Sequence, residues 1–156
     1  MESSAPWQPW NGIGDGAGPA ERHERSVQMT ALQPSRLLRG SMLMDAVISG
    51  ATGLLLVAGA GLLTSLLGVP EALMRYAGLI LLPFAAIVLY LARAPQPSRT
   101  SVQAVIVLNV AWAAGSMLLL VSGWIEPTWL GMAFVTFQAV VVAGFAELQY
   151  AGLRRA

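Results

Sequence analysis

Residues 42–94 read MLMDAVISGATGLLLVAGAGLLTSLLGVPEALMRYAGLILLPFAAIVLYLARA, and this stretch decides the fold of the chain. It contains two apolar runs, residues 43–67 and 72–92, which are separated by a short turn with Gly68 and Pro70. About 20 helical residues, at about 1.5 Å each, cross the hydrocarbon core of a bilayer. Both runs are long enough, so the stretch predicts a helical hairpin that spans a membrane twice.

Two more apolar runs follow, at residues 102–122 and 128–150. The chain has 156 residues, of which 56% are hydrophobic and only 11% are charged, whereas soluble domains are about 25% charged. We therefore expect an all-α membrane protein with four transmembrane helices. Short connections predict sequential antiparallel neighbours in an up-down-up-down bundle. Small residues at four-residue spacing, which permit close helix contact, are most frequent in the first run, so we expect that helix to be central.

Arginine is concentrated on one side of the four runs, and the chain has no lysine. Six arginines flank the runs on that side: Arg36, Arg39, Arg93, Arg99, Arg154 and Arg155. The connections on the other side carry Glu71 and Glu126, with only Arg75 nearby. Because arginine-rich segments stay on the cytoplasmic side of a membrane, both termini are predicted to be cytoplasmic. We expect a multi-pass protein of a bacterial inner membrane.

Residues 1–40 have a different composition, rich in proline, glycine, serine and charged residues. They lack periodic apolar positions and cannot bury enough surface to offset chain entropy, which predicts a disordered cytoplasmic tail before a transmembrane domain at residues 41–156. Trp7 and Trp10 are interpreted as isolated apolar residues of this tail rather than as membrane or partner contacts. An alternative is that translation starts at a later methionine: Met29, Met42 or Met44.

The sequence carries no motif for catalysis, metal binding or nucleotide binding. Cysteine is absent, which excludes disulfides and thiolate chemistry, and the single histidine, His23, stands alone in the tail. No basic stripe with interleaved aromatic residues indicates nucleic-acid binding. We therefore expect a protein that is not an enzyme, with no catalytic, metal-binding or cofactor-binding residue, no cofactor and no nucleic-acid partner.

Glu71 and Arg75 are the candidate polar site at the outer ends of the helices. Arg75 lies about one turn inside the second run and four residues after Glu71. One hypothesis makes Arg75 an anion-binding or gating residue. We favour the other, in which Arg75 reaches the interface and pairs with Glu71, because residues four apart face each other on a helix.

A second candidate group lies toward the opposite, cytoplasmic side of the four runs: Asp45, Arg93, Asn109, Glu147 and Gln149. If the three charged side chains face inward, they form an ion-pair lock or a proton entry point. We favour interfacial charges in contact with headgroups and water, because none of the three lies deep in its apolar run. Asn109 and Gln138 lie well inside their runs and are interpreted as donors of hydrogen bonds between helices.

Two features define local helix structure. Thr100 and Gln103 stand at capping-box spacing and predict the start of the third helix. Pro83 lies within the second run, where it removes a backbone hydrogen bond to the carbonyl of Leu79.

The arginine-preceded run beginning MDAVISG, together with the ending FAELQYAGLRR at residues 145–155, resembles small bacterial four-helix inner-membrane proteins that are DoxX-like in layout. The resemblance covers residues 36–156 and rests on pattern and loop spacing, so it transfers no functional residue. It implies an accessory role beside a quinone-linked oxidoreductase.

The favoured function is an accessory or structural subunit of a membrane assembly, with membrane lipids, other subunits or a second copy as partners. A second hypothesis is a small transporter similar to the four-helix multidrug type, which needs a carboxylate deep in the first helix, whereas Asp45 lies at the margin of its run. A third is a lipid-binding or quinone-binding module with a cavity near Pro83, Trp112 and Asn109.

Overall fold

The computed structural model of the chain describes residues 18–19 and 34–156. Its contacts divide the chain into two units, Met1–Thr30 and Ala31–Ala156, and the helices discussed below all belong to the second unit. The predicted disordered tail lies outside the described residues except for 18–19 and 34–40, and so do Trp7, Trp10 and His23.

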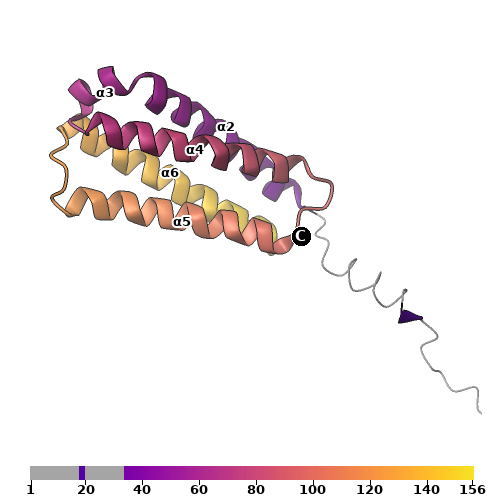
Figure 1. Cartoon of the computed structure of the whole chain (residues 1–156). Coiled ribbons are helices and arrows are strands. Elements are labelled where there is room, and N and C mark those ends of the chain that lie inside the picture. Colours follow the sequence, from indigo (N-terminus) through magenta and orange to yellow (C-terminus); the bar gives the residue numbers. More distant parts are fainter. Residues whose placement is uncertain (1–17, 20–33) are drawn as a thin grey trace, which may run out of the picture. The chain divides into compact units, whose positions relative to one another are not determined.

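The described part of the second unit is helical: α2 (Arg36–Ala58), α3 (Ala60–Leu67), α4 (Glu71–Arg93), α5 (Arg99–Val121) and α6 (Trp129–Leu153). Helices α2, α4, α5 and α6 are each long and apolar enough to cross a bilayer. Successive spans run in opposite directions along the bundle (Figure 1). The prediction of an all-α, four-span membrane protein is confirmed.

The first apolar run, predicted as one helix over 43–67, is divided at Gly59. Helix α2 ends at Ala58 and α3 begins at Ala60, with Gly59 at φ −96° and ψ 3°. The Gly59 N–H still donates to the Leu55 carbonyl at 2.8 Å, so the chain bends without losing this bond. Glycine is about 1 kcal/mol less favourable than alanine inside a helix, which makes Gly59 a preferred place to bend.

Helix α2 begins at Arg36, seven positions before the apolar run from which it was predicted and ahead of the predicted tail boundary at residue 40. Ser35 caps it, because its hydroxyl accepts a hydrogen bond from the Leu38 N–H at 3.2 Å. The start predicted for the third helix is also corrected: Ser98, rather than Thr100, caps α5 and accepts from the Ser101 N–H at 3.1 Å. Hydroxyl caps satisfy otherwise orphan backbone donors, so helices extend beyond their apolar residues.

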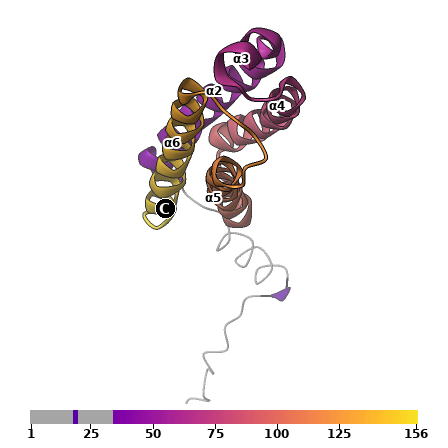
Figure 2. The ribbon, with the colours of Figure 1, turned by 90° about the vertical axis from the view of Figure 1, so that its left-hand side faces the viewer.

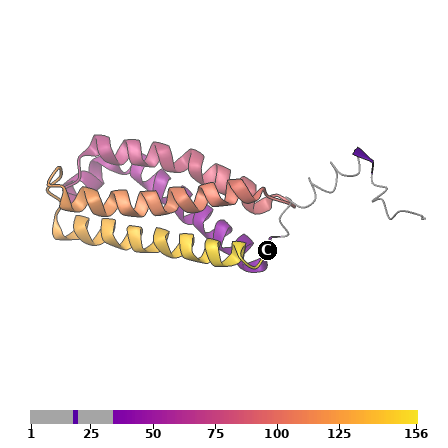
Figure 3. The ribbon, with the colours of Figure 1, turned by 90° about the horizontal axis from the view of Figure 1, so that it is seen from below.

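Helix α2 occupies the centre of the contacts, as predicted. It packs along α4 and also against α6, while α5 packs against α6. Seen from below, α4, α5 and α6 lie in front and α2 crosses behind them (Figure 3). Helices α4 and α5, which a short loop joins, approach each other closely at few backbone positions, although Val88 of α4 and Val105 of α5 belong to one buried apolar cluster.

Glycines explain the close crossing of α2 and α4. A Cβ added to Gly78 would lie 2.7 Å from the Gly53 carbonyl oxygen, which is too close for any side chain. At the two ends of the bundle, Gly152 lies against the Leu38 backbone and Gly131 against the Leu67 carbonyl in the same way. Backbones that approach this closely gain van der Waals contact, the main source of helix association in lipid.

Hydrogen bonds fasten both ends of the bundle. The Ser35 hydroxyl donates to the Gly152 carbonyl at 2.9 Å, so the start of α2 and the end of α6 meet at one end. At the other end, the Thr128 hydroxyl donates to the Leu66 carbonyl at 2.8 Å. An end-on view shows α2 and α6 side by side (Figure 2).

Candidate functional site

The central polar feature is a buried carboxylate. Asp45 on α2 is 0% exposed, and three neutral side chains donate to it. Asn109 Nδ2 on α5 and Gln149 Nε2 on α6 each lie 2.7 Å from Asp45 Oδ2, and Ser49 Oγ lies 3.0 Å from Oδ1. Asn109 Nδ2 also donates to Gln149 Oε1 at 3.3 Å. We call these four residues the Asp45 network.

The network joins three helices in the interior of the bundle. An ionised carboxylate only accepts hydrogen bonds, and here both of its oxygens meet donors. Among residues 34–156 no basic side chain pairs with Asp45. Burial of a polar group is costly unless it is hydrogen-bonded, so the three donors compensate the transfer of Asp45 away from water.

The favoured interpretation of Asp45 as an interfacial charge is therefore wrong. Its helix starts at Arg36, so Asp45 lies about two and a half turns inside α2 rather than at its beginning. The ion-pair lock does not form either, because Glu147 and Arg93 are both exposed and pair with no group among the described residues.

The interpretation of Asn109 as a donor between helices is confirmed, and so is that of Gln138, whose Nε2 lies 3.5 Å from Ser116 Oγ. Gln149 was grouped with Glu147 from the sequence, but its burial was not predicted. Its position continues the buried face of α6, which includes Ala139, Ala146 and Gln149. Helical spacing from Ala139 was the available signal.

Two cavities lie between α4 and α5. The larger, of about 440 Å³, is lined by Leu73 and Ala77 of α4, by Gly115 of α5 and by Gln138 of α6, among others. The second, of about 240 Å³, is lined by Ser49, Pro83, Asn109 and Trp112 with apolar neighbours. A cavity near Pro83, Trp112 and Asn109 was predicted, and one is present.

Trp112 is shared by the cavities: it lines both of them and also a third, of about 100 Å³, against α2 and α6. Its indole Nε1 is buried and has no hydrogen-bond partner within the described part of the chain. A buried indole N–H normally donates a hydrogen bond to an acceptor, because a buried donor without such a bond costs about 1–3 kcal/mol. Trp112 therefore brings one unsatisfied buried donor next to the cavities.

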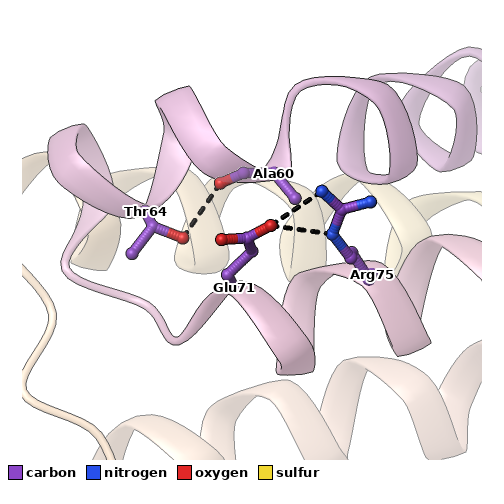
Figure 4. Close-up of polar contacts among 4 residues, drawn as sticks. All are labelled: Ala60, Thr64, Glu71 and Arg75. Carbon is purple, nitrogen blue, oxygen red and sulfur yellow. Dashed lines mark hydrogen bonds and ion pairs between the residues drawn. The ribbon is translucent and has the colours of Figure 1, made fainter.

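At the opposite end of the bundle from Ser35, Glu71 and Arg75 form the predicted ion pair, with Arg75 Nη2 2.7 Å from Glu71 Oε1. Both side chains are about half exposed. Figure 4 shows the pair beside α3, where the Thr64 hydroxyl donates to the Ala60 carbonyl. The expected pairing of Arg75 with Glu71 is confirmed, because the guanidinium contacts the carboxylate four residues earlier.

These observations define the class: the chain is a multi-pass integral membrane protein with an all-α four-span bundle. Comparison with protein-family models, curated proteins and solved structures finds no match. The described residues contain no group of three or more His, Asp or Glu side chains able to hold a metal ion.

Proposed function

We propose that the protein is a non-enzymatic membrane module that binds an apolar molecule carrying a hydrogen-bond acceptor, of the lipid or quinone class, in the cavities between α4 and α5. The unsatisfied Nε1 of Trp112 carries this proposal. A carbonyl oxygen of a lipid ester or of a quinone is the kind of acceptor that this N–H lacks.

The volume and chemistry of the cavities support the same ligand class. The larger cavity, of about 440 Å³, falls within the range of about 300–1,000 Å³ found for small-molecule sites. Its walls are mainly leucine, alanine and aromatic side chains, with Ser116 and Gln138 as polar exceptions. The backbones of α4 and α5 approach closely at few positions, and we infer that an apolar molecule enters the cavities between these two helices.

Membrane orientation and cellular role are further parts of the proposal. Six arginines lie at the bundle end where α2 begins and α6 ends, and Arg75 alone lies at the other among the described residues. This asymmetry supports a bacterial inner-membrane protein whose arginine-rich end is cytoplasmic. Within such a membrane, the module serves as an accessory subunit that supplies or holds its ligand for a larger assembly.

The test is extraction of the purified full chain. Protein solubilised in mild detergent is extracted with organic solvent, and the extract is analysed by mass spectrometry for lipids and by ultraviolet absorption for quinones. Trp112→Phe keeps an aromatic ring and removes the N–H, so we expect it to retain less than about a tenth of the wild-type ligand. The matched control is Trp129→Phe, because Trp129 is 75% exposed and outside the cavities.

A substitution that fills the larger cavity tests the proposal independently. Gly115 lines the larger cavity and has open space around its α-carbon, so Gly115→Leu occupies the site and is expected to lower ligand retention. Wild-type protein that yields no stoichiometric apolar molecule contradicts the proposal. Equal retention by Trp112→Phe and Trp129→Phe contradicts the role of the indole.

The buried carboxylate supports a small transporter as the second candidate function. Sequence position alone placed Asp45 too near the margin, whereas its 0% exposure deep in α2 removes that objection. Asp45→Asn removes the charge but keeps the shape, and it is expected to abolish proton-coupled efflux of a cationic dye. Glu147→Gln is the control, because Glu147 is exposed. Unchanged efflux in Asp45→Asn eliminates this candidate.

A further inference from the structure

A second site lies on the outer face of the α5–α6 pair, separate from the central cavities. At the arginine-rich end, a pocket of about 650 Å³ is lined by Arg99 and Gln103 of α5, by Tyr150 of α6 and by Arg154 directly after α6, with apolar neighbours. Two arginines, one at the start of α5 and one directly after α6, thus face one hollow. We call it the arginine pocket.

Within the described part of the chain, both arginines of the pocket lack a carboxylate partner. No acidic side chain pairs with Arg99 or Arg154 in the described ranges, where Glu71–Arg75 is the ion pair found. Arg99 is the first residue of α5, and the first turn contains no acidic residue, so the positive end of the helix dipole adds to its charge. Arg154 lies over the Tyr150 ring, 5.9 Å from its centroid, which holds its guanidinium at the pocket.

The pocket continues into an apolar groove toward the middle of the bilayer. A hollow of about 530 Å³ between α5 and α6 shares Ile106 and Tyr150 with the arginine pocket. The groove exists because small side chains form its walls, including Ala113 and Ala143. Its length runs along the two helices, in the direction in which an acyl chain lies in a bilayer.

Glu147 also lines the groove, and its negative charge restricts an anion to the part of the site near Arg99 and Arg154. It lies seven residues before Arg154 on α6, or about 10 Å along the helix axis. A negative headgroup is therefore repelled from the groove and attracted to its arginine-bearing mouth. The site is thus positively charged at its mouth and apolar along the groove, which matches an anionic headgroup followed by an acyl chain.

We propose that the arginine pocket and the groove bind one anionic phospholipid, with its phosphate between Arg99 and Arg154 and an acyl chain along the groove. Guanidinium groups suit phosphate because their fork of N–H donors matches two phosphate oxygens. Basic pockets between transmembrane helices at the arginine-rich side are places where anionic headgroups bind.

The experiment is native mass spectrometry of the full chain in detergent, with phosphatidylglycerol or phosphatidylcholine added at equal concentrations. We expect phosphatidylglycerol to be retained in preference, and the double variant Arg99→Gln with Arg154→Gln to lower its apparent affinity about thirtyfold. The matched control is Arg36→Gln with Arg155→Gln, which removes two exposed arginines from the same end outside the pocket, and it is expected to change affinity less than about threefold.

Two further arms identify the occupant. Ala143→Leu narrows the groove without touching the arginines, and it is expected to weaken phosphatidylglycerol binding while leaving the selectivity for charge. Glycerol phosphate, which has the headgroup and no acyl chain, is expected not to compete at millimolar concentration.

Three results overturn the assignment. Equal losses in the two double variants mean that the general charge of this end binds the lipid. Full competition by glycerol phosphate means that the pocket binds a free phosphate ester. A lipid-free dimer that Ala143→Leu dissociates means that a helix of a second copy occupies the groove.

Discussion

Helix α4 faces two neighbours in two different ways. Against α2 it forms a tight seam in which Gly78 and Gly53 bring the two backbones together. Against α5 it forms a looser contact, here called the open seam, where the backbones lie farther apart and cavities of about 440 and 240 Å³, both lined by Trp112, remain. The short helix α3 and a turn join α2 to α4, and a short loop joins α4 to α5. Both connections make the joined helices antiparallel, so the difference between the two seams comes from the residues at the contact.

The contrast assigns different work to the two seams. Close backbone contact stabilises a bundle in lipid, where burial of apolar surface gains little. A seam without that contact contributes less to stability and is available for a ligand. The tight α2–α4 seam and the Asp45 network therefore hold the bundle, and the proposed binding site lies at the open α4–α5 seam.

The largest effect is expected from breaking the tight seam. Gly78→Leu places a side chain against the Gly53 carbonyl and Val57, and should lower the free energy of unfolding by about 3 kcal/mol. The measurement is unfolding in mixed micelles followed by circular dichroism. The same change at Gly115, where nothing lies within 4 Å of an added Cβ, should alter stability by less than about 1 kcal/mol. Equal losses at the two glycines contradict the distinction between the seams.

The next largest effect concerns the Asp45 network, which ties α2 to α5 and α6. Asp45→Leu leaves the donors of Ser49, Asn109 and Gln149 without their acceptor and should lower the free energy of unfolding by about 2 kcal/mol.

Asp45→Asn serves as the control in the same unfolding assay. Its side-chain oxygen can still accept from Asn109 and Gln149, and its amide can donate to the Ser49 hydroxyl, so the loss should stay below about 1 kcal/mol. If the asparagine variant is as unstable as the leucine variant, the charge rather than the hydrogen bonding of Asp45 holds the helices.

Trp112→Phe tests whether the indole N–H at the open seam lacks a hydrogen-bond partner. In protein stripped of bound molecules, the change removes a buried N–H that has no partner, which offsets the smaller ring, so the free energy of unfolding should change by less than about 1 kcal/mol. Wild-type protein should gain more than the variant when apolar ligand is restored, as measured by the midpoint of thermal unfolding. A loss above about 2 kcal/mol in stripped protein would mean that the indole N–H is satisfied.

The smallest effect is expected at a contact that belongs to neither seam. Glu71 and Arg75 lie one turn apart on α4 and are about half exposed, so their coupling free energy should be about 0.3–0.5 kcal/mol. A double-mutant cycle with Glu71→Gln and Arg75→Gln measures it, at low and at high salt. Coupling above about 1 kcal/mol, or coupling that salt leaves unchanged, would indicate a buried pair.

Much of the fold was predictable, whereas the candidate site was predictable only in part. Four spans and the cavity near Pro83, Trp112 and Asn109 were expected and are present. Asp45 was misplaced because its helix was measured from the first apolar residue, while the backbone hydrogen bonds begin at the cap residue Ser35. The bend at Gly59 was also missed, since hydropathy does not register a bend.

Residue order alone was enough to establish the number of spans, their alternation and the end at which arginine collects. A bilayer offers no water to backbone groups, so a long apolar stretch must be a helix, and this constraint acts on each stretch separately. The faces that meet, the burial of Asp45 and the opening between α4 and α5 depend on side chains brought together from distant parts of the chain. Lipid tails are as apolar as leucine, so the apolar pattern of a span does not distinguish its inner face from its outer face. Close glycine contacts and hydrogen-bonded polar groups determine which face of each span points inward.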